Sequence, residues 1–385
     1  MGGPHARPCV AERDLGNSRP MKSTGKSSEQ STVLRNRGAA RPIRLKELAK
    51  RLNLSPTTIS LVLNRAPAAK AIPESTKQRI FEAAEGLNYR PNLMARSLRS
   101  QRTYSIGVLV PEFSDGYSAT VLSGIEEVLL REGYIYLVTT HRHKPQFIDR
   151  NSKLLYERRV EGLIAVDTPY DQHLPLPVVS VSGHKKVSGV TNIVLNHRRA
   201  SEAALAHLVE LGHQNIAFLQ GQEFSSDTAV RWDAIRAAAK KLGIRIYSEN
   251  VARLEGDSPS PEPGYEAARK VLEGGQAFTA LIAFNDTSAI GAVRAFREAG
   301  LEVPRDISVI GFDDVSAAAY HNPALTTIRQ PLWRMGVLAA ENLLERIVAG
   351  KSSGAPETIH VEAELIVRES TAPAASSARR RQRSR

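Results

Sequence analysis

The chain has 385 residues, 42% hydrophobic and 24% charged, which is enough for two or three domains with ordinary cores. A single cysteine, Cys9, excludes an internal disulfide framework, and the absence of any run of 18 apolar residues excludes a transmembrane helix of the usual kind. The net charge of +12 is uneven. Residues 1–100 hold 19 Lys and Arg against 7 Asp and Glu, and five arginines follow residue 370. A basic head on a near-neutral body fits nucleic-acid binding, although basic tails can also be merely solvated.

The first 41 residues are rich in Arg, Ser, Gly and Pro and have no apolar period, so we expect them to be disordered. They also lack the apolar stretch of a secretory signal, which favours a cytoplasmic protein. Apolar residues then recur at helical spacing over 45–52, which predicts an amphipathic helix. Asn53 and Leu54 form a turn. Ser55 is a good helix N-cap, and Pro56 suits the first position of a second helix that runs to about Leu63.

A third helix is predicted over 74–87, with an apolar face made of Ile80, Phe81, Ala84 and Leu87. The first two helices and their short turn have the spacing of a helix-turn-helix, which places its second helix in the major groove of DNA. On that second helix Ile59, Val62 and Leu63 form the buried face. A merely packed pair of helices is the alternative.

The opposite face of the second helix carries the predicted DNA contacts. The first turn, Pro56 and Thr57, is expected to face base edges, with Leu61 beside them. Leu61 can pack on a thymine methyl group but cannot form a bidentate contact with guanine. Four side chains have the hydroxyl or amide chemistry for phosphate contacts: Ser55, Thr58, Ser60 and Asn64.

From Ser105 onward, short apolar runs such as SIGVLV, GLIAVD and NIAFLQG alternate with amphipathic helical segments. Fully apolar strands separated by helices predict parallel sheets covered on both faces. There are too many strands for one compact unit. The predicted fold is therefore an α/β core of two doubly wound parallel-sheet lobes, preceded by an all-α helix-turn-helix head.

Four segments, in this order, closely resemble the LacI/GalR family of bacterial regulators: LKELAKRLNLSPTTISLVLN, GLNYRPNLMARSLRSQRTYSIGVLVP, HLVELGHQNIAFLQG and AFNDTSAIGAVRAFREAGLEVPRDISVIGFDD. The resemblance covers about residues 43–370. It implies a core like that of periplasmic sugar-binding proteins, with a ligand between two lobes. It also implies a dimeric, DNA-binding regulator of transcription, more typically a repressor.

On this basis we expect the following organisation: a disordered tail over 1–41, a helix-turn-helix domain over 42–91, a hinge helix and linker over 92–103, lobe one over 104–213 and 331–357, lobe two over 214–330 and 358–370, and a disordered tail over 371–385. In the hinge segment, the resemblance implies that Leu98 wedges between base pairs in the minor groove. Arg96 would supply positive charge there. The alternative is a plain linker helix.

The resemblance also places the effector site. Ligand contacts are expected at the carboxyl ends of strands, facing the cleft between the lobes. The expected effector-binding residues are Asp115, Tyr117, Arg231, Asn285 and Asp313. Carboxylates, amides and a guanidinium suit a hydroxyl-rich ligand such as a sugar. Asp286 and Asp314 are equally explained as caps of the helices that follow them.

Some positions depart from the family pattern. Asn196, His197 and Ala200 replace a common Asp-Asn-x-x-Gly, and Arg199 is added at the start of the next helix. That arginine would either favour an anionic sugar or be solvated. The segment 258–261 replaces an aromatic lid position.

No catalytic residues, metal ligands or cofactors are predicted. His141 and His143 lack acidic or cysteine partners at workable spacing and are expected in a surface loop. Neither a phosphate-binding glycine loop nor a nucleophile elbow follows any strand. An enzyme is one alternative function. A secreted binding protein is another, but it leaves residues 43–99 unexplained. The expected partners are operator DNA, a sugar-type effector and a second copy of the chain, with no membrane.

Overall fold

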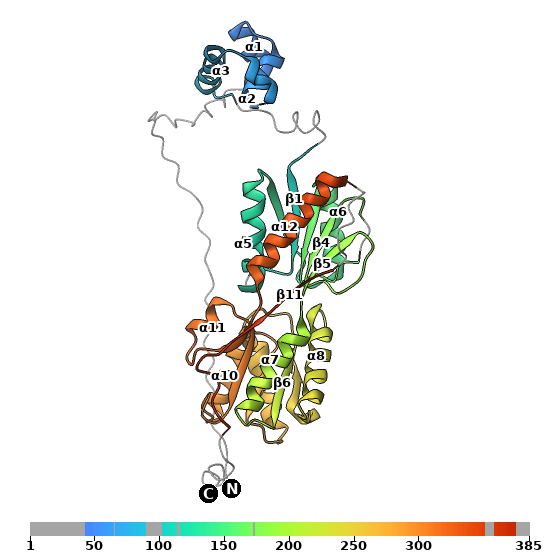
Figure 1. Cartoon of the computed structure of the whole chain (residues 1–385), viewed down its shortest axis with the longest axis vertical. Helices are drawn as coiled ribbons and strands as arrows, with labels where there is room; N and C mark the ends of the chain where they lie inside the picture. Colours follow the sequence, from blue (N-terminus) through green and yellow to red (C-terminus); the bar gives the residue numbers. More distant parts are fainter. Residues whose placement is uncertain are drawn as a thin grey trace, which may run out of the picture. The chain divides into compact units, whose positions relative to one another are not determined.

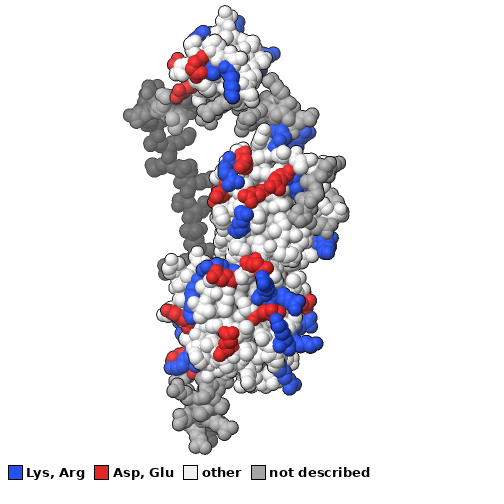
Figure 2. Space-filling view, in the orientation of Figure 1, with Lys and Arg blue, Asp and Glu red and all other residues white. Residues whose placement is uncertain are grey.

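The computed structural model describes residues 43–64, 66–89, 102–113, 116–171, 174–350 and 358–374. The chain divides into two compact units, residues 1–92 and residues 93–385. The first is the helical head, and the second is the α/β core (Figure 1). On the face seen in Figure 2, basic and acidic side chains are interspersed on both units. The predicted tail at 1–41, residues 375–385 of the predicted tail at 371–385, and the hinge residues Arg96 and Leu98 lie outside the described residues.

The head contains three α-helices and a 3₁₀ helix: α1 (Leu45–Leu52), α2 (Pro56–Leu63), η1 (Pro67–Ala71) and α3 (Glu74–Gly86). Asn53 ends α1 in the left-handed conformation, which asparagine tolerates better than most residues. Ser55 caps α2 by accepting a hydrogen bond from the Thr58 backbone amide at 3.0 Å. The predicted two helices and turn are therefore confirmed.

A small apolar core holds the head together. Leu48, Ile59, Val62 and Ile80 are buried, one or two from each of the three α-helices. The predicted apolar face of α3 is wrong at one position, because Phe81 is exposed. It lies one residue after Ile80, which turns its side chain about 100° away from the core-facing stripe.

Lobe one is built on a six-stranded sheet in which every pairing is parallel, in the order β11-β5-β4-β3-β1-β2. Its elements are β1 (Ser105–Val110), α5 (Gly116–Arg131), β2 (Ile135–Thr140), α6 (Pro145–Glu157), β3 (Gly162–Val166), β4 (Val178–Val181), β5 (Val190–Leu195), α12 (Leu332–Ala349) and β11 (Thr358–Val361). All residues of β1, β3, β4 and β5 are buried, as the apolar runs at β1, β3 and β4 predicted, whereas β2, which also follows from an apolar run, is partly exposed.

Lobe two has a second six-stranded sheet, in the order β12-β10-β9-β8-β6-β7. Only its β10–β12 pair is antiparallel. Its elements are α7 (His197–Glu210), β6 (Ile216–Gln220), α8 (Asp227–Lys241), η2 (Ser248–Asn250), β7 (Val251–Arg253), α9 (Glu262–Glu273), β8 (Ala280–Ile282), α10 (Asp286–Glu298), β9 (Ser308–Asp313), α11 (Ser316–Tyr320), β10 (Thr326–Arg329) and β12 (Glu364–Ile366). The predicted fold class is confirmed.

Three expected boundaries need correction. Strand β11 was expected in lobe two, but it pairs with β5 in the sheet of lobe one. Helix α7 was expected in lobe one, but it packs against α8, β10 and β12 of lobe two. The C-terminal tail was expected to be disordered from residue 371, yet Thr371 lies 3.0 Å from His207 and the Ala374 amide donates to the Leu211 carbonyl. The chain thus crosses between the lobes after β5, after β10 and after β11.

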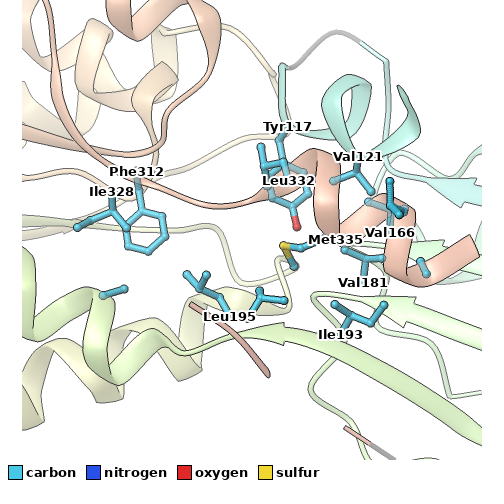
Figure 3. Packing of buried hydrophobic residues seen from close by; sticks show 14 of the residues in the cluster. Tyr117, Val121, Val166, Val181, Ile193, Leu195, Phe312, Ile328, Leu332 and Met335 are labelled. Carbon is cyan, nitrogen blue, oxygen red and sulfur yellow. The ribbon is translucent and has the colours of Figure 1, made fainter. Parts of the chain in front are cut away.

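One apolar cluster runs through both lobes. It includes Val121, Val166 and Ile193 of lobe one and Phe312 and Ile328 of lobe two. Leu332 and Met335, at the start of α12, lie between these groups (Figure 3). The second crossing is therefore packed into the core rather than left as an exposed connection.

Helices α5 and α12 pack with their backbones in close approach, and Figure 1 shows them side by side on lobe one. A Cβ atom added at Gly124 would lie 2.0 Å from the Trp333 carbonyl oxygen. One added at Gly336 would lie 2.0 Å from the Val121 carbonyl oxygen. Only glycine permits this contact, which fixes α12 and hence the residues that lead into it.

None of the helices in the described part of the chain combines the length and apolar character that crossing a bilayer requires.

Candidate functional site

The exposed face of α2 is the candidate DNA-reading surface. Pro56, Thr57 and Asn64 are exposed and Leu61 is half-buried, while Ile59 and Val62 face the core. Helix α2 therefore packs one face against the core of the head and exposes the opposite face, as a helix that binds in a DNA groove requires. Its N-terminal turn, which would approach base edges, carries no charged side chain.

Most of the predicted phosphate-contacting side chains already have partners within the helix. The Ser55 and Thr58 hydroxyls lie 2.8 Å apart, and the Asn64 amide donates to the Ser60 carbonyl at 2.7 Å. These bonds hold the side chains in fixed orientations. Hydroxyl groups keep further donor or acceptor capacity, so phosphate binding stays compatible with them.

A cavity of about 80 Å³ lies between the lobes, and we call it the interlobe cavity. Its walls are loops that follow the carboxyl ends of strands, as expected for an open α/β sheet. Lobe one contributes Pro111, Glu112, His143 and Asp167, and lobe two contributes residues that include Gln222, Phe224, Ser225, Asp257, Ser258, Ser260, Phe284 and Asn285. Polar side chains from both lobes thus face a common space.

Of the four expected effector contacts that the structure describes, Asn285 alone lines this cavity. Its side chain also caps α10, accepting from the Ser288 amide at 2.8 Å. Tyr117, Arg231 and Asp313 are buried nearby rather than on the wall, and Asp115 lies outside the described residues. Effector contact by the three buried residues stays a prediction, and it requires a more open arrangement of the lobes.

Arg231 is the central group of this buried region. Its side chain is 4% exposed and donates to the Asp227 carboxylate at 2.9 Å and to the Phe284 carbonyl. The guanidinium carbon lies 3.7 Å from the Phe312 ring centroid and 4.5 Å from that of Phe284. Its Nε has no hydrogen-bond partner among the described residues. The guanidinium is thus held by one ion pair, one carbonyl and two aromatic faces.

Asp227 joins Arg231 to two histidines. His184 Nε2 lies 2.7 Å and His197 Nε2 lies 3.2 Å from the same carboxylate oxygen. Burial alone would raise the pKa of Asp227, but His197, His184 and Arg231 together hold it well below its usual range. Burial lowers the pKa of His197, so this ring is neutral at pH 7. The result is an ionised carboxylate with neutral and charged donors around it.

The lobes also contact each other beside this group. The Ser226 hydroxyl of lobe two donates to the Asp167 carboxylate of lobe one at 2.9 Å. His184 belongs to lobe one, and its bond to Asp227 is a second polar link between the lobes. Ligand entry must break or rearrange such links.

Asp313 ends β9 and is fully enclosed. The Gln330 side-chain amide donates to it at 2.6 Å. Burial raises the pKa of Asp313 well above its usual range, although the Arg231 charge and the hydrogen bond from Gln330 oppose this shift. Its backbone φ of 106° lies in the region that favours glycine, and such strain is frequent at binding sites.

Tyr117 likewise contributes to packing. Its hydroxyl lies 2.5 Å from that of Ser182, and burial raises its pKa well above the usual range. In Figure 3 the ring sits beside Leu332 at the junction of the lobes. In this arrangement Tyr117 is a core residue with one satisfied hydroxyl.

The capping interpretation of Asp286 and Asp314 is wrong. Asn285 is the N-cap of α10, whereas Asp286 is buried and accepts from the Thr327 hydroxyl at 2.5 Å and from the Val315 amide at 2.9 Å. Asp314 pairs with Arg329 and Arg368, each at 2.6 Å. Both carboxylates tie neighbouring segments of lobe two together.

Two further expectations are resolved by position. The Arg199 side chain is 72% exposed and pairs with Glu362, so the solvated interpretation holds. His141 and His143 are not in an exposed loop. His141 is fully buried, 2.9 Å from the Thr168 hydroxyl, and His143 lines the interlobe cavity, stacked on Phe224 at 3.9 Å.

Sequence reasoning missed His184, Asp227 and Asp167. One local signal existed, because Asp227 precedes Arg231 by four residues on one helix, a spacing that pairs opposite charges. No local pattern links either residue to His184, which lies 43 positions before Asp227.

Asp286 gives a pH-dependent prediction. Burial raises its pKa to about 7, above the ordinary value of about 3.9 expected in the unfolded chain. The folded state then binds the proton more tightly, so this carboxyl lowers stability as pH rises from about 4 to about 7. We expect Asp286→Asn to gain stability relative to the unsubstituted protein across this window, by roughly 1.4 kcal/mol per pH unit.

Urea unfolding at several pH values measures this difference. Asp233→Asn, at an exposed position of α8, is the matched control and should show a constant difference. A constant difference for Asp286→Asn as well would contradict the assigned pKa.

Comparison with known proteins supports the two-unit reading. Residues 44–92 match the family described as bacterial regulatory proteins, lacI family, and residues 205–371 match a periplasmic binding protein-like domain. A transcriptional repressor PurR of Actinobacillus pleuropneumoniae is 31% identical over 85% of this chain and 97% of its own length. The PurR repressor of Haemophilus influenzae is 32% identical over 85% of this chain and 98% of its own.

Solved structures agree. The lac repressor dimer bound to operator and the anti-inducer ONPF is 26% identical, with a TM-score of 0.77, over 86% of this chain and 100% of that one. A LacI family regulator from Enterococcus faecium with bound ribose is 27% identical, with a TM-score of 0.61, over 70% of this chain and 100% of that one. The head, the two lobes and these identities together establish that this chain belongs to the LacI family of bacterial transcriptional regulators.

Proposed function

We propose that this regulator is a cytoplasmic, homodimeric repressor whose operator binding is controlled by a sugar-type effector held between its lobes, and that it catalyses no reaction. One observation supports this most directly. The same chain carries an exposed, polar α2 face in its head and a polar interlobe cavity in its core. The first suits DNA and the second suits a small ligand.

Specific DNA reading is assigned to Pro56, Thr57 and Leu61, with Ser55, Thr58, Ser60 and Asn64 as phosphate contacts. The head's first described helix also carries Lys50 and Arg51 in its last turn, which add attraction to the DNA backbone. Arg96 and Leu98 complete the proposed interface in the minor groove. Since Thr57 is the exposed hydrogen-bonding residue of the first turn, it is the best candidate for direct base contact.

A sugar-type effector fits the polar lining of the cavity. His143, Asp167, Ser225 and Asn285 offer both donors and acceptors to hydroxyl groups. At about 80 Å³ the cavity is smaller than ligand pockets of roughly 300–1,000 Å³, so binding requires the lobes to separate and close again. The effector then has different affinities for the open and the closed arrangement of the lobes. Coupling between effector binding and DNA binding requires such a difference.

The homodimer is supported by exposed apolar side chains on lobe one: Leu130, Ile135 and Leu137, whose exposed fractions are 61%, 61% and 39%. Two of these lie on β2, the edge strand of the sheet. An exposed apolar edge strand promotes association unless a partner covers it. A second copy of the chain is the occupant that the family assignment favours, and the related lac repressor structure is a dimer.

The first prediction concerns DNA. Thr57→Ala should weaken specific operator binding by roughly 1 kcal/mol, about fivefold, through loss of one hydrogen bond. Non-specific binding should be unchanged, because no charge is removed. The measurement is a mobility shift with a DNA sequence that the full-length protein selects from a random pool. Ser75→Ala, at an exposed position of α3, is the control. Equal losses in both variants would refute the assigned reading face.

The second prediction concerns the dimer. Ile135→Glu should place an unpaired charge in the subunit interface and raise the dimer dissociation constant by at least about 100-fold. Sedimentation velocity at matched concentrations reports this directly. Val230→Glu, at an exposed apolar residue of α8, should leave the dimer intact. A dimer that survives Ile135→Glu would place the interface elsewhere.

The third prediction concerns the effector. Asp313→Ala should leave basal operator binding intact but raise the effector concentration for half-maximal response at least about tenfold, because a buried hydrogen-bonding group is lost. The probes are ribose, cellobiose and, as a non-sugar comparison, hypoxanthine. Asp149→Ala, on the surface of α6, is the control. Hypoxanthine as the sole active probe would reject a sugar-type effector, and a normal response in Asp313→Ala would remove Asp313 from the pocket.

A further inference from the structure

The buried group around Asp227 contains three potential metal ligands, none of which is among the proposed DNA or effector contacts. We call His184, His197 and Asp227 the imidazole–carboxylate cluster. One ligand atom from each residue lies within 4.8 Å of the other two. The side chains are 18%, 3% and 7% exposed, so the cluster is shielded from bulk water.

The spacing is close to what a tetrahedral ion requires. Zinc binds imidazole nitrogen at about 2.0–2.1 Å and carboxylate oxygen at about 2.0–2.2 Å, which places neighbouring ligand atoms roughly 3.3 Å apart. The two Nε2-to-carboxylate distances are 2.7 Å and 3.2 Å. Small side-chain shifts therefore convert the hydrogen-bonded cluster into a coordinating one.

The surroundings prepare the carboxylate for coordination. Its second oxygen accepts from Arg231, which the Phe284 carbonyl and the Phe312 ring hold in place. Carboxylates that ligate metals are commonly oriented by such a partner on the other oxygen. The first oxygen faces the two histidine Nε2 atoms, and an ion bound by all three groups would replace these hydrogen bonds. An imidazole can bind an ion through Nε2 when its ring proton resides on Nδ1.

We propose that the imidazole–carboxylate cluster is a binding site for a divalent ion of the zinc class, with His184, His197 and Asp227 as ligands. Two nitrogens and one oxygen favour zinc and its neighbours over magnesium or calcium, which prefer oxygen ligands alone. Three protein ligands leave a fourth position for water or for an atom of a bound effector.

The site joins the two lobes. His184 follows β4 of lobe one, whereas His197 and Asp227 begin α7 and α8 of lobe two. An ion held by all three therefore stabilises the arrangement in which the lobes are closed at this point. Because the ion binds the closed arrangement in preference to an open one, it shifts the equilibrium between the two toward the closed arrangement. This inference concerns the core alone and does not depend on the effector's being a sugar.

The test is a titration of Zn²⁺ into the full-length, untagged protein by calorimetry, with Mg²⁺ as a comparison ion. We expect His184→Ala to abolish the binding of one Zn²⁺ per chain or to weaken the affinity for that ion at least about tenfold. Tenfold is about the lower limit seen when a group that merely orients a metal ligand is removed. His360→Ala, at an exposed histidine of β11, is the matched control and should bind as the unsubstituted protein does. The comparison isolates the cluster from zinc bound elsewhere in the chain, for example near Cys9.

A second measurement guards against loss of folding. Co²⁺ in a four-coordinate site with nitrogen ligands gives a characteristic visible absorption, which should appear in the unsubstituted protein and in His360→Ala. It should be absent in His184→Ala and in Asp227→Asn, each with a far-ultraviolet circular dichroism spectrum like that of the unsubstituted protein. Zinc binding and Co²⁺ absorption that are equal in His184→Ala and His360→Ala would overturn the proposal, as would the absence of both from the unsubstituted protein. Neither result would bear on operator binding, which is measured separately.

Discussion

The buried pair of Arg231 and Asp227 is the interaction on which the organisation of the core depends. A guanidinium away from water is tolerated only if its charge and its donors are matched, and removal of one member of such a pair typically costs 3–5 kcal/mol. Here the charge is matched by Asp227, one donor by the Phe284 carbonyl, and the faces of the cation by two aromatic rings. Helix α8, the end of β8 and the end of β9 are thereby fixed relative to one another.

The same carboxylate also reaches out of lobe two. Through His184 it contacts lobe one, and the adjacent Ser226 does so through Asp167. These two polar contacts between the lobes therefore lie at or beside the buried Arg231–Asp227 pair. A ligand that enters the interlobe cavity competes with these contacts. Their loss affects α8 and the two neighbouring strands, β8 and β9.

The parts of this molecule that could be predicted from sequence are those whose determinants are local. Ser55, Pro56 and the 3.6-residue period define α2 without reference to anything distant. The fully apolar strands likewise predicted two parallel sheets. Strand β11 was assigned to the wrong lobe because a short segment after a long helix carries no signal of which sheet it will join.

The interior of the cleft was predicted less well, for a related reason. Asp286 and Asn285 are adjacent and both suit a helix cap, and the choice between them depends on Thr327 and Val315, which lie far along the chain. The partnership of His184 with Asp227 is equally non-local. Side-chain chemistry led to residues of which one, Asn285, lines the interlobe cavity. The pairing of charges within it is set by the tertiary fold.

The late position of two edge strands has a consequence for biosynthesis. Strand β11 completes the sheet of lobe one and β12 that of lobe two, and both lie between residues 358 and 366. Domains generally fold in order as they leave the ribosome. The head has its own core and can fold early, whereas both lobes stay unfinished until almost the whole sequence has been translated. During synthesis the nascent chain therefore has a folded DNA-binding head before its two-lobed core is complete.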